Sequence, residues 1–85
     1  MAKKKRKKIK IIERKLGKEQ AWGLAWQGDN MIEIDERLSP SKKLSTYVHE
    51  LLHLADINMP EYKVEKISQF IGKGLWQAGY RKIEE

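Results

Sequence analysis

The 85-residue chain contains no cysteine. Disulfides, thiolate metal sites and thiol nucleophiles are therefore excluded, and the absence fits a reducing, cytoplasmic compartment. The chain also lacks an apolar run of the ~20 residues that a membrane-spanning helix needs, so no membrane partner is expected. Its N-terminus runs directly into charged residues, which gives no sign of a secretory signal.

The length suits one domain, near the lower size at which a hydrophobic core alone gives a stable fold. A bound metal would therefore contribute to folding as well as to chemistry. We expect a basic, disordered leader at residues 1–8 and a single folded domain at residues 9–85. A monomer is favoured.

Positive charge is concentrated near the N-terminus. The net charge is +6, but seven of the 18 lysines and arginines lie within Lys3–Lys10, so the remainder is nearly neutral. One interpretation is a solvated leader that aids solubility. The alternatives are a nuclear address or an anchor for nucleic-acid phosphates, whose binding would depend on salt and not on base sequence. The candidate nucleic-acid residues are Lys3, Lys4, Lys5, Arg6, Lys7 and Lys8.

Three segments show the period-two pattern of β-strands. Lys8–Leu16 is rich in β-branched residues, and Gln20–Gln27 places Trp22 and Trp26 on one side. Met31–Asp35 alternates again after a Gly-Asp-Asn turn, so the last two segments are predicted to form a hairpin. We expect a small three-stranded antiparallel sheet, in which the tryptophans pack in the core or across strands rather than serve as a base-stacking platform.

Two helices are predicted to follow the strands. Ser39 and Pro40 supply a capping hydroxyl and a first-position proline, and apolar residues then recur at helical spacing for about four turns. Pro60 is expected at the first position of the second helix. Gly79 should end that helix in a left-handed conformation, with Tyr80 completing a Schellman-type cap. The predicted fold class is therefore α+β, with a small antiparallel sheet packed against two helices.

Both histidines of the chain lie in the stretch His49–His53 (HELLH), inside the first predicted helix. Residues four apart share a helix face, so the two imidazoles can reach one metal ion. Glu50 is close enough to bond a metal-bound water without ligating the metal. H-E-x-x-H thus combines two zinc ligands with a carboxylate general base. The alternative is an ordinary helix whose histidines bind no metal.

Catalytic zinc normally takes three protein ligands and keeps the fourth position for water. Because the sequence has no third histidine, the remaining ligand must be a carboxylate. Glu61 and Glu65 lie one turn apart near the start of the second helix, which a short loop would bring beside the end of the first. Spacing alone leaves open which glutamate is the ligand, or whether the two form only a solvated pair of like charges.

The stretch His49–His53, followed by Glu61–Glu65 (EYKVE), resembles the gluzincin type of zinc metallopeptidase. In particular it is similar to small phage-encoded, minigluzincin-like metallopeptidases, which are related in layout to SprT-like proteins. Met31–Asp35 and Leu75–Tyr80 are also similar to that phage group. The resemblance covers roughly residues 20–81.

The resemblance implies a metal site and a mechanism. It implies Zn²⁺ ligands at His49, His53 and Glu61. Glu50 would be the general base that activates a zinc-bound water to hydrolyse a peptide or protein substrate. Glu65, four residues after the glutamate ligand, would orient His49 from outside the coordination sphere. Many gluzincins have Asp at this position, so the longer side chain is a departure.

The resemblance also implies how substrate binds. In related folds an edge strand beside the motif helix pairs with extended substrate, and Met31–Asp35 is the candidate here. Its residues are Met31, Ile32, Glu33, Ile34 and Asp35. Tyr47, Tyr80 and Arg81 are alternative candidates for stabilising the oxyanion, and no spacing rule chooses among them.

Three classes of function follow from these patterns. The leading hypothesis is a zinc-dependent metallopeptidase, a hydrolase. The second is a zinc-stabilised binding or regulatory module with the same ligands and no useful turnover, because the chain lacks room for a subdomain that would wall the substrate cleft. The third is a nucleic-acid-binding protein that uses the basic leader.

Overall fold

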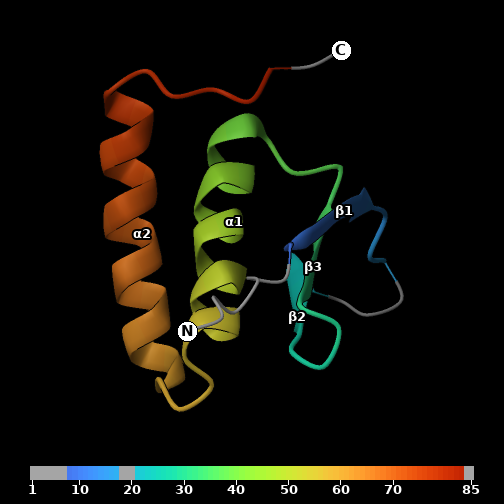
Figure 1. Ribbon diagram of the computed structural model, residues 1–85. Helices are drawn as coiled ribbons and strands as arrows, with labels where there is room; N and C mark the ends of the chain where they lie inside the picture. The colour runs from blue at the N-terminus through green and yellow to red at the C-terminus, as the bar shows by residue number, and fades with distance from the viewer. Residues whose placement is uncertain (1–7, 18–20, 84–85) are drawn as a thin grey trace, which may run out of the picture.

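The structure is a computed structural model that describes residues 8–17 and 21–83. The strands are β1 (Lys10–Arg14), β2 (Gly23–Trp26) and β3 (Met31–Asp35), and the helices are α1 (Pro40–Ala55) and α2 (Glu61–Gln77). In Figure 1, α1 stands between the sheet and α2, and it contacts both. The predicted α+β fold of a three-stranded sheet packed with two helices is confirmed.

β3 is the central strand of the sheet, in the order β1-β3-β2. β2 pairs with it antiparallel, as the predicted hairpin requires, whereas β1 runs parallel to β3. The prediction of an all-antiparallel sheet is therefore wrong for β1. The chain reverses direction between β1 and β2 and again between β2 and β3, so β3 regains the direction of β1. Because β3 also inserts between the other two strands, it pairs with β1 in parallel.

The sheet buries one face. Ile32 and Ile34 of β3 are completely buried, as are Leu16 after β1 and Val64 of α2. Alternation along β3 turns Glu33 to the opposite face. These four residues are the fully buried hydrophobic core of the described chain, a small core of the kind expected for a short domain.

Glu33 is only 7% exposed although α1 does not cover its face of the sheet. Arg14 Nε donates to Glu33 Oε2 at 2.6 Å, and Trp26 Nε1 donates to Oε1 at 2.8 Å. The hydrogen bond from Arg14 is the main reason why the pKa of Glu33 lies below its ordinary value, although burial acts in the opposite direction. Side chains from the two outer strands therefore shield a charge on the central strand.

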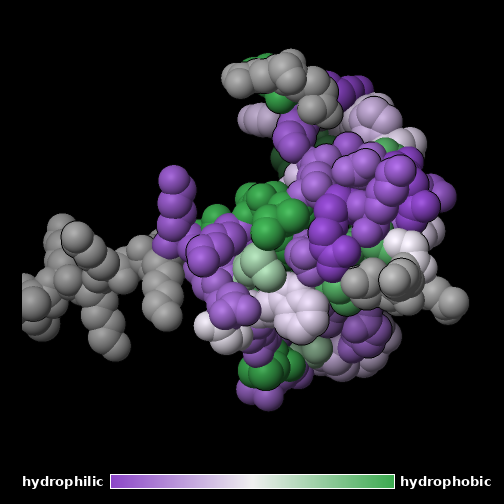
Figure 2. Space-filling model, turned by 90° about the vertical axis from the view of Figure 1, so that its right-hand side faces the viewer, coloured by the Kyte–Doolittle hydropathy of each residue, from purple (hydrophilic) through white to green (hydrophobic). Residues whose placement is uncertain are grey.

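The two tryptophans do not lie in the core. Trp22 and Trp26 are 56% and 44% exposed, so the prediction of core packing is wrong. Trp26 does cross to the neighbouring strand, but it covers Glu33 on the face that neither α1 nor α2 packs against. Figure 2 looks onto the sheet side of the molecule and shows hydrophobic patches between hydrophilic groups. Ile11 and Ile12 of β1 are among the exposed large hydrophobic residues.

Both helices begin close to their predicted prolines. Pro40 is the first residue of α1, and Ser39 precedes it, but the Ser39 side chain makes no capping hydrogen bond. Its backbone carbonyl instead accepts the N–H of Lys43 at 2.8 Å, so the predicted hydroxyl cap is wrong. α2 begins at Glu61, one residue later than expected, because Pro60 is itself the capping residue.

α2 ends in the predicted Schellman motif. Gly79 has a φ of 94°, a left-handed conformation that glycine adopts without steric cost. The N–H of Tyr80 donates to Leu75 O at 3.0 Å, and the N–H of Gly79 donates to Trp76 O at 3.0 Å. These are the two hydrogen bonds that define the motif, so this prediction is confirmed.

A polar cluster that the sequence did not predict joins β1 to α1 and to the C-terminal tail. Glu13 accepts hydrogen bonds from Lys43 Nζ at 2.8 Å, from Lys82 Nζ at 2.5 Å and from the Tyr47 hydroxyl. Burial alone would raise the pKa of Glu13, but these hydrogen bonds outweigh it and lower the pKa to about 2. The cluster therefore holds an ionised carboxylate beneath the edge of the sheet.

Gly72 of α2 packs closely against Ser45 of α1. A Cβ added to Gly72 would lie 2.9 Å from both Cα and Cβ of Ser45. Gly72→Ala is therefore expected to force the helices apart and to lower the free energy of unfolding by about 1–3 kcal/mol. Urea denaturation followed by circular dichroism measures this change.

Gly74→Ala is the matched control for this substitution. Gly74 lies in the same helix, and its added Cβ would have no atom within 4 Å. We expect this substitution to stabilise the protein by about 0.5–1 kcal/mol, because alanine favours the helical backbone. If both variants were equally stabilised, close helix packing at Gly72 would not limit the structure.

Candidate metal centre

Three side chains from two helices meet at the C-terminal end of α1. The rings of His49 and His53 have their centroids 5.0 Å apart. Glu61 Oε1 lies 2.9 Å from His49 Nε2, and Glu61 Oε2 lies 3.2 Å from His53 Nε2. One ligand atom from each residue lies within 4.8 Å of the other two, so this His-His-Glu group can hold a metal ion.

A short connection brings Glu61 to the histidines. After α1, the N–H of Met59 donates to Asp56 O at 3.2 Å, and the N–H of Asn58 donates to Asp56 Oδ1 at 3.0 Å. Pro60 then caps the start of α2, and Val64, one turn into that helix, is completely buried. The turn and this buried anchor set the first turn of α2 against the last turns of α1.

The donor set fits a divalent transition metal. Two imidazoles and one carboxylate are the ligands of many catalytic zinc sites, which keep a further position for water. The side chains of His49 and His53 are 17% and 25% exposed, and that of Glu61 is 67% exposed. The group is therefore anchored on one side by the protein and reached by solvent on the other.

Glu65 lies on the other side of the His49 ring. Its Oε2 is 3.3 Å from His49 Nδ1, and Ser68 Oγ is 3.4 Å from the same nitrogen. Gln69 Nε2 donates to Glu65 Oε1 at 2.6 Å and so holds this carboxylate in place. A hydrogen bond at Nδ1 leaves the lone pair of Nε2 free for a metal. Glu61 is thus the glutamate that contacts both imidazoles, and Glu65 contacts the outer nitrogen of one.

Sequence reasoning did not single out Ser68 or Gln69. Both lie on α2 within one turn of Glu65, and Ser68 is almost completely buried at 2% exposure. The one available signal was helical spacing, because Ser68 lies seven residues after Glu61 on the same helix face. That spacing is common to many polar residues, so it could not identify a partner of His49.

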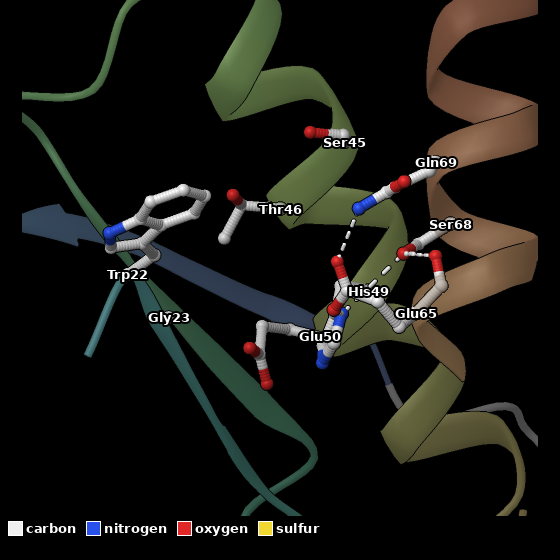
Figure 3. Close-up of a pocket in the computed structure, with 9 residues that line it drawn as sticks. All are labelled: Trp22, Gly23, Ser45, Thr46, His49, Glu50, Glu65, Ser68 and Gln69. Atoms are coloured by element: carbon white, nitrogen blue, oxygen red, sulfur yellow. Dashed lines mark hydrogen bonds and ion pairs between the residues drawn. The ribbon is translucent and has the colours of Figure 1, made fainter. Parts of the chain in front are cut away.

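Glu50 is 7% exposed and points toward β2 (Figure 3). Burial raises the pKa of its carboxyl, and the charges of His49 and His53 act in the opposite direction. The backbone of β2 comes so close that a Cβ on Gly23 would lie 2.8 Å from Glu50 Cγ. A glycine inside a predicted strand is a recognised sign of such an approach, although the sequence did not reveal what lay opposite.

A cavity of about 270 Å³ opens between β2, α1 and α2 beside these groups. Its lining includes His49, Glu50, Glu65 and Trp22, and the close-up in Figure 3 shows the Trp22 ring across the cavity from α2. The exposed indole predicted for the core therefore stands at the mouth of the candidate site.

The predicted substrate-pairing strand is wrong. Met31–Asp35 forms β3, whose backbone pairs with β1 on one side and with β2 on the other. A central strand has no free backbone groups to offer to a peptide. Of its residues, Ile32, Glu33, Ile34 and Asp35 are buried, and Met31 is partly exposed. The strand next to Glu50 is β2, which pairs only with β3 in the described part of the chain.

None of the three oxyanion candidates lines the cavity at Glu50. The Tyr47 hydroxyl donates to Glu13, and the Arg81 guanidinium carbon lies 3.3 Å from the centroid of the Trp76 ring. Tyr80 follows the far end of α2. All three candidates line a separate cavity of about 220 Å³.

The basic leader lies almost entirely outside the described residues, which include only Lys8 of the nucleic-acid candidates, an exposed side chain. Lys3, Lys4, Lys5, Arg6 and Lys7 fall in the part that is not described. Across residues 8–17 and 21–83, neither helix combines the length and apolar character of a membrane span.

Comparisons of the chain with family models, curated proteins and solved structures give no match.

Proposed function

We propose that the protein is a zinc-dependent peptidase of the gluzincin type. His49, His53 and Glu61 would bind the metal, and Glu50 would act as the general base. The observation that carries this proposal is the contact of one Glu61 carboxylate with the Nε2 atoms of both histidines of an H-E-x-x-H helix.

When bound, zinc polarises a peptide carbonyl and makes a water molecule more acidic. The chain's own residues supply the proton transfers. Glu50 accepts the proton of the attacking water and returns it to the leaving amine. Its burial supports this role, because burial raises the pKa of this carboxyl, and a more basic carboxylate takes the proton of the attacking water more readily. Glu65 keeps the His49 ring in the orientation that directs Nε2 to the metal.

β2 is the proposed binding strand for an extended substrate. It is an edge strand of the described sheet, and Gly23 brings its backbone against Glu50. A peptide that added to this edge would pass directly over the general base, and main-chain hydrogen bonds would hold it there. This assignment replaces Met31–Asp35 in the predicted role.

Zinc dependence of stability and cleavage tests the proposal. We expect mass spectrometry to find one zinc ion per chain, and removal by a chelator to abolish peptide cleavage. Zinc at 100 times its dissociation constant stabilises a folded protein by about 2.7 kcal/mol, which for this size raises the Tm by about 10–20 °C. The matched control is His53→Ala, whose Tm should not respond to zinc. A wild-type protein with no zinc-dependent change in Tm or cleavage would contradict the proposal.

A further inference from the structure

The cavity beside His49 continues along the groove between α1 and α2. A second hollow of about 450 Å³ shares Trp22, Ser45 and Gln69 with that cavity. In Figure 3, Ser45 and Gln69 lie beyond His49 in the direction of the start of α1. The groove therefore leads away from the metal centre toward the start of α1 and the end of α2.

We call the far part of this groove the lysine hollow and define it by Lys42, Lys73, Trp22 and Trp76. Lys42 Nζ lies 4.7 Å from the centroid of the Trp22 ring. None of the described residues that line the hollow is acidic, and neither lysine makes an ion pair within the described chain. Two cations therefore face the hollow without a neutralising carboxylate.

The two ends of the groove have opposite chemistry. The metal end carries Glu50 and Glu65, whereas the lysine hollow carries positive charge beside two aromatic rings. An anionic group is attracted to such a place, and a cationic group is repelled from it. The indole rings of Trp22 and Trp76 add apolar surface that would pack against the carbon atoms of the same residue.

We propose that the lysine hollow is a subsite for a carboxylate of the peptide substrate. The carboxylate would be an Asp or Glu side chain or the free C-terminus of the peptide. This inference rests on the proposed peptidase function and adds the substrate class.

Lys42 precedes His49 by seven residues, a rise of ~10 Å along the helix, which an extended peptide covers in about three residues. The preferred carboxylate therefore lies about three residues from the cleaved bond.

The test uses the zinc-loaded full chain and internally quenched peptides without tryptophan. Glu, Ala or Lys is placed in turn at each position on both sides of the cleaved bond, and each peptide is made with a free and an amidated C-terminus. We expect kcat/KM to be about tenfold higher for Glu than for Ala at one position, and lower still for Lys. If only the free C-terminus gives the preference, the terminal carboxylate is the ligand.

Charge reversal links the preference to the lysine hollow. In the double variant Lys42→Glu/Lys73→Glu, the ratio of kcat/KM for Glu over Lys peptides should invert. The control is Lys10→Glu/Lys15→Glu, which makes the same change in net charge at exposed positions on and after β1. This control should keep the wild-type ratio. An unchanged ratio in both double variants would overturn the proposal.

Binding to the zinc-loaded Glu50→Gln variant, followed by tryptophan fluorescence, tests the subsite without turnover. A dissociation constant about tenfold lower for the Glu peptide than for the Ala peptide supports the subsite. If the Glu, Ala and Lys peptides bind with equal dissociation constants and are cleaved with equal kcat/KM values, the subsite proposal is overturned. This holds even if cleavage shows that the protein is a peptidase. Selective binding of Glu peptides with no cleavage by the wild type keeps the subsite and refutes the peptidase.

Discussion

The Glu50→Gln variant, loaded with zinc, is expected to hydrolyse peptides with a kcat about 100- to 10,000-fold below that of the wild type. The amide has nearly the shape of the carboxylate but cannot accept the proton of the attacking water. Because Glu50 is 7% exposed and lies under β2, a water or buffer molecule from bulk solvent cannot easily act as the base in its place. The kinetics of an internally quenched peptide measure the loss, and mass spectrometry should show that zinc is retained.

Glu36→Gln is the matched control for this substitution. It makes the same change of charge at an exposed position just after β3, away from the metal centre, and should leave kcat unchanged. Cleavage by Glu50→Gln at the wild-type rate would remove Glu50 from the mechanism. If neither the wild type nor the variant cleaves peptides while both bind zinc, the protein is better described as a zinc-stabilised binding module.

Glu61→Ala is expected to weaken zinc binding far more than Glu65→Ala does. Loss of a group outside the coordination sphere typically lowers metal affinity about 10- to 100-fold, which is the effect we expect for Glu65. Glu61 contacts the Nε2 atoms of both His49 and His53, so its removal takes away a ligand and should lower the affinity more than 100-fold. Competition with a chromophoric chelator measures both affinities.

The stability of the two variants without zinc is the control. The side chains of Glu61 and Glu65 are 67% and 54% exposed, so neither truncation removes core packing. Both metal-free variants should therefore unfold close to the wild type. The reverse order of zinc affinities would mean that Glu65 is the ligand and that α2 turns to bring it forward.

Zinc would also compensate for the small core of this protein. Of the four completely buried hydrophobic residues of the described chain, Val64 is the only one that α2 contributes. A metal held by α1 and by the first residue of α2 would tie the two helices together at the end opposite to the Schellman cap. Metal binding and helix docking would then be one process.

Local sequence patterns determined most of the elements and several residues of the candidate site. Alternation predicted β3 to the residue, and the strands before it were predicted longer than they are. Helical periodicity, the prolines and Gly79 predicted both helices and the end of α2. These features depend on neighbours along the chain, where steric and hydrogen-bonding preferences act directly. H-E-x-x-H needs only one turn of helix, so His49, Glu50 and His53 were evident as well.

Only the tertiary structure decided how these pieces face one another. Period-two alternation is the same in parallel and antiparallel strands, so it could not reveal that β1 is parallel to β3 or that β3 is central. The exposure of Trp26 depended on which face of the sheet a helix covers, whereas Trp22 precedes β2 and lines the cavity beside α1 and α2. Glu61 and Glu65 are one turn apart on one helix face and are equivalent in sequence. The turn after α1 and the burial of Val64 set the first turn of α2 against α1, and that placement puts Glu61 between the two imidazoles.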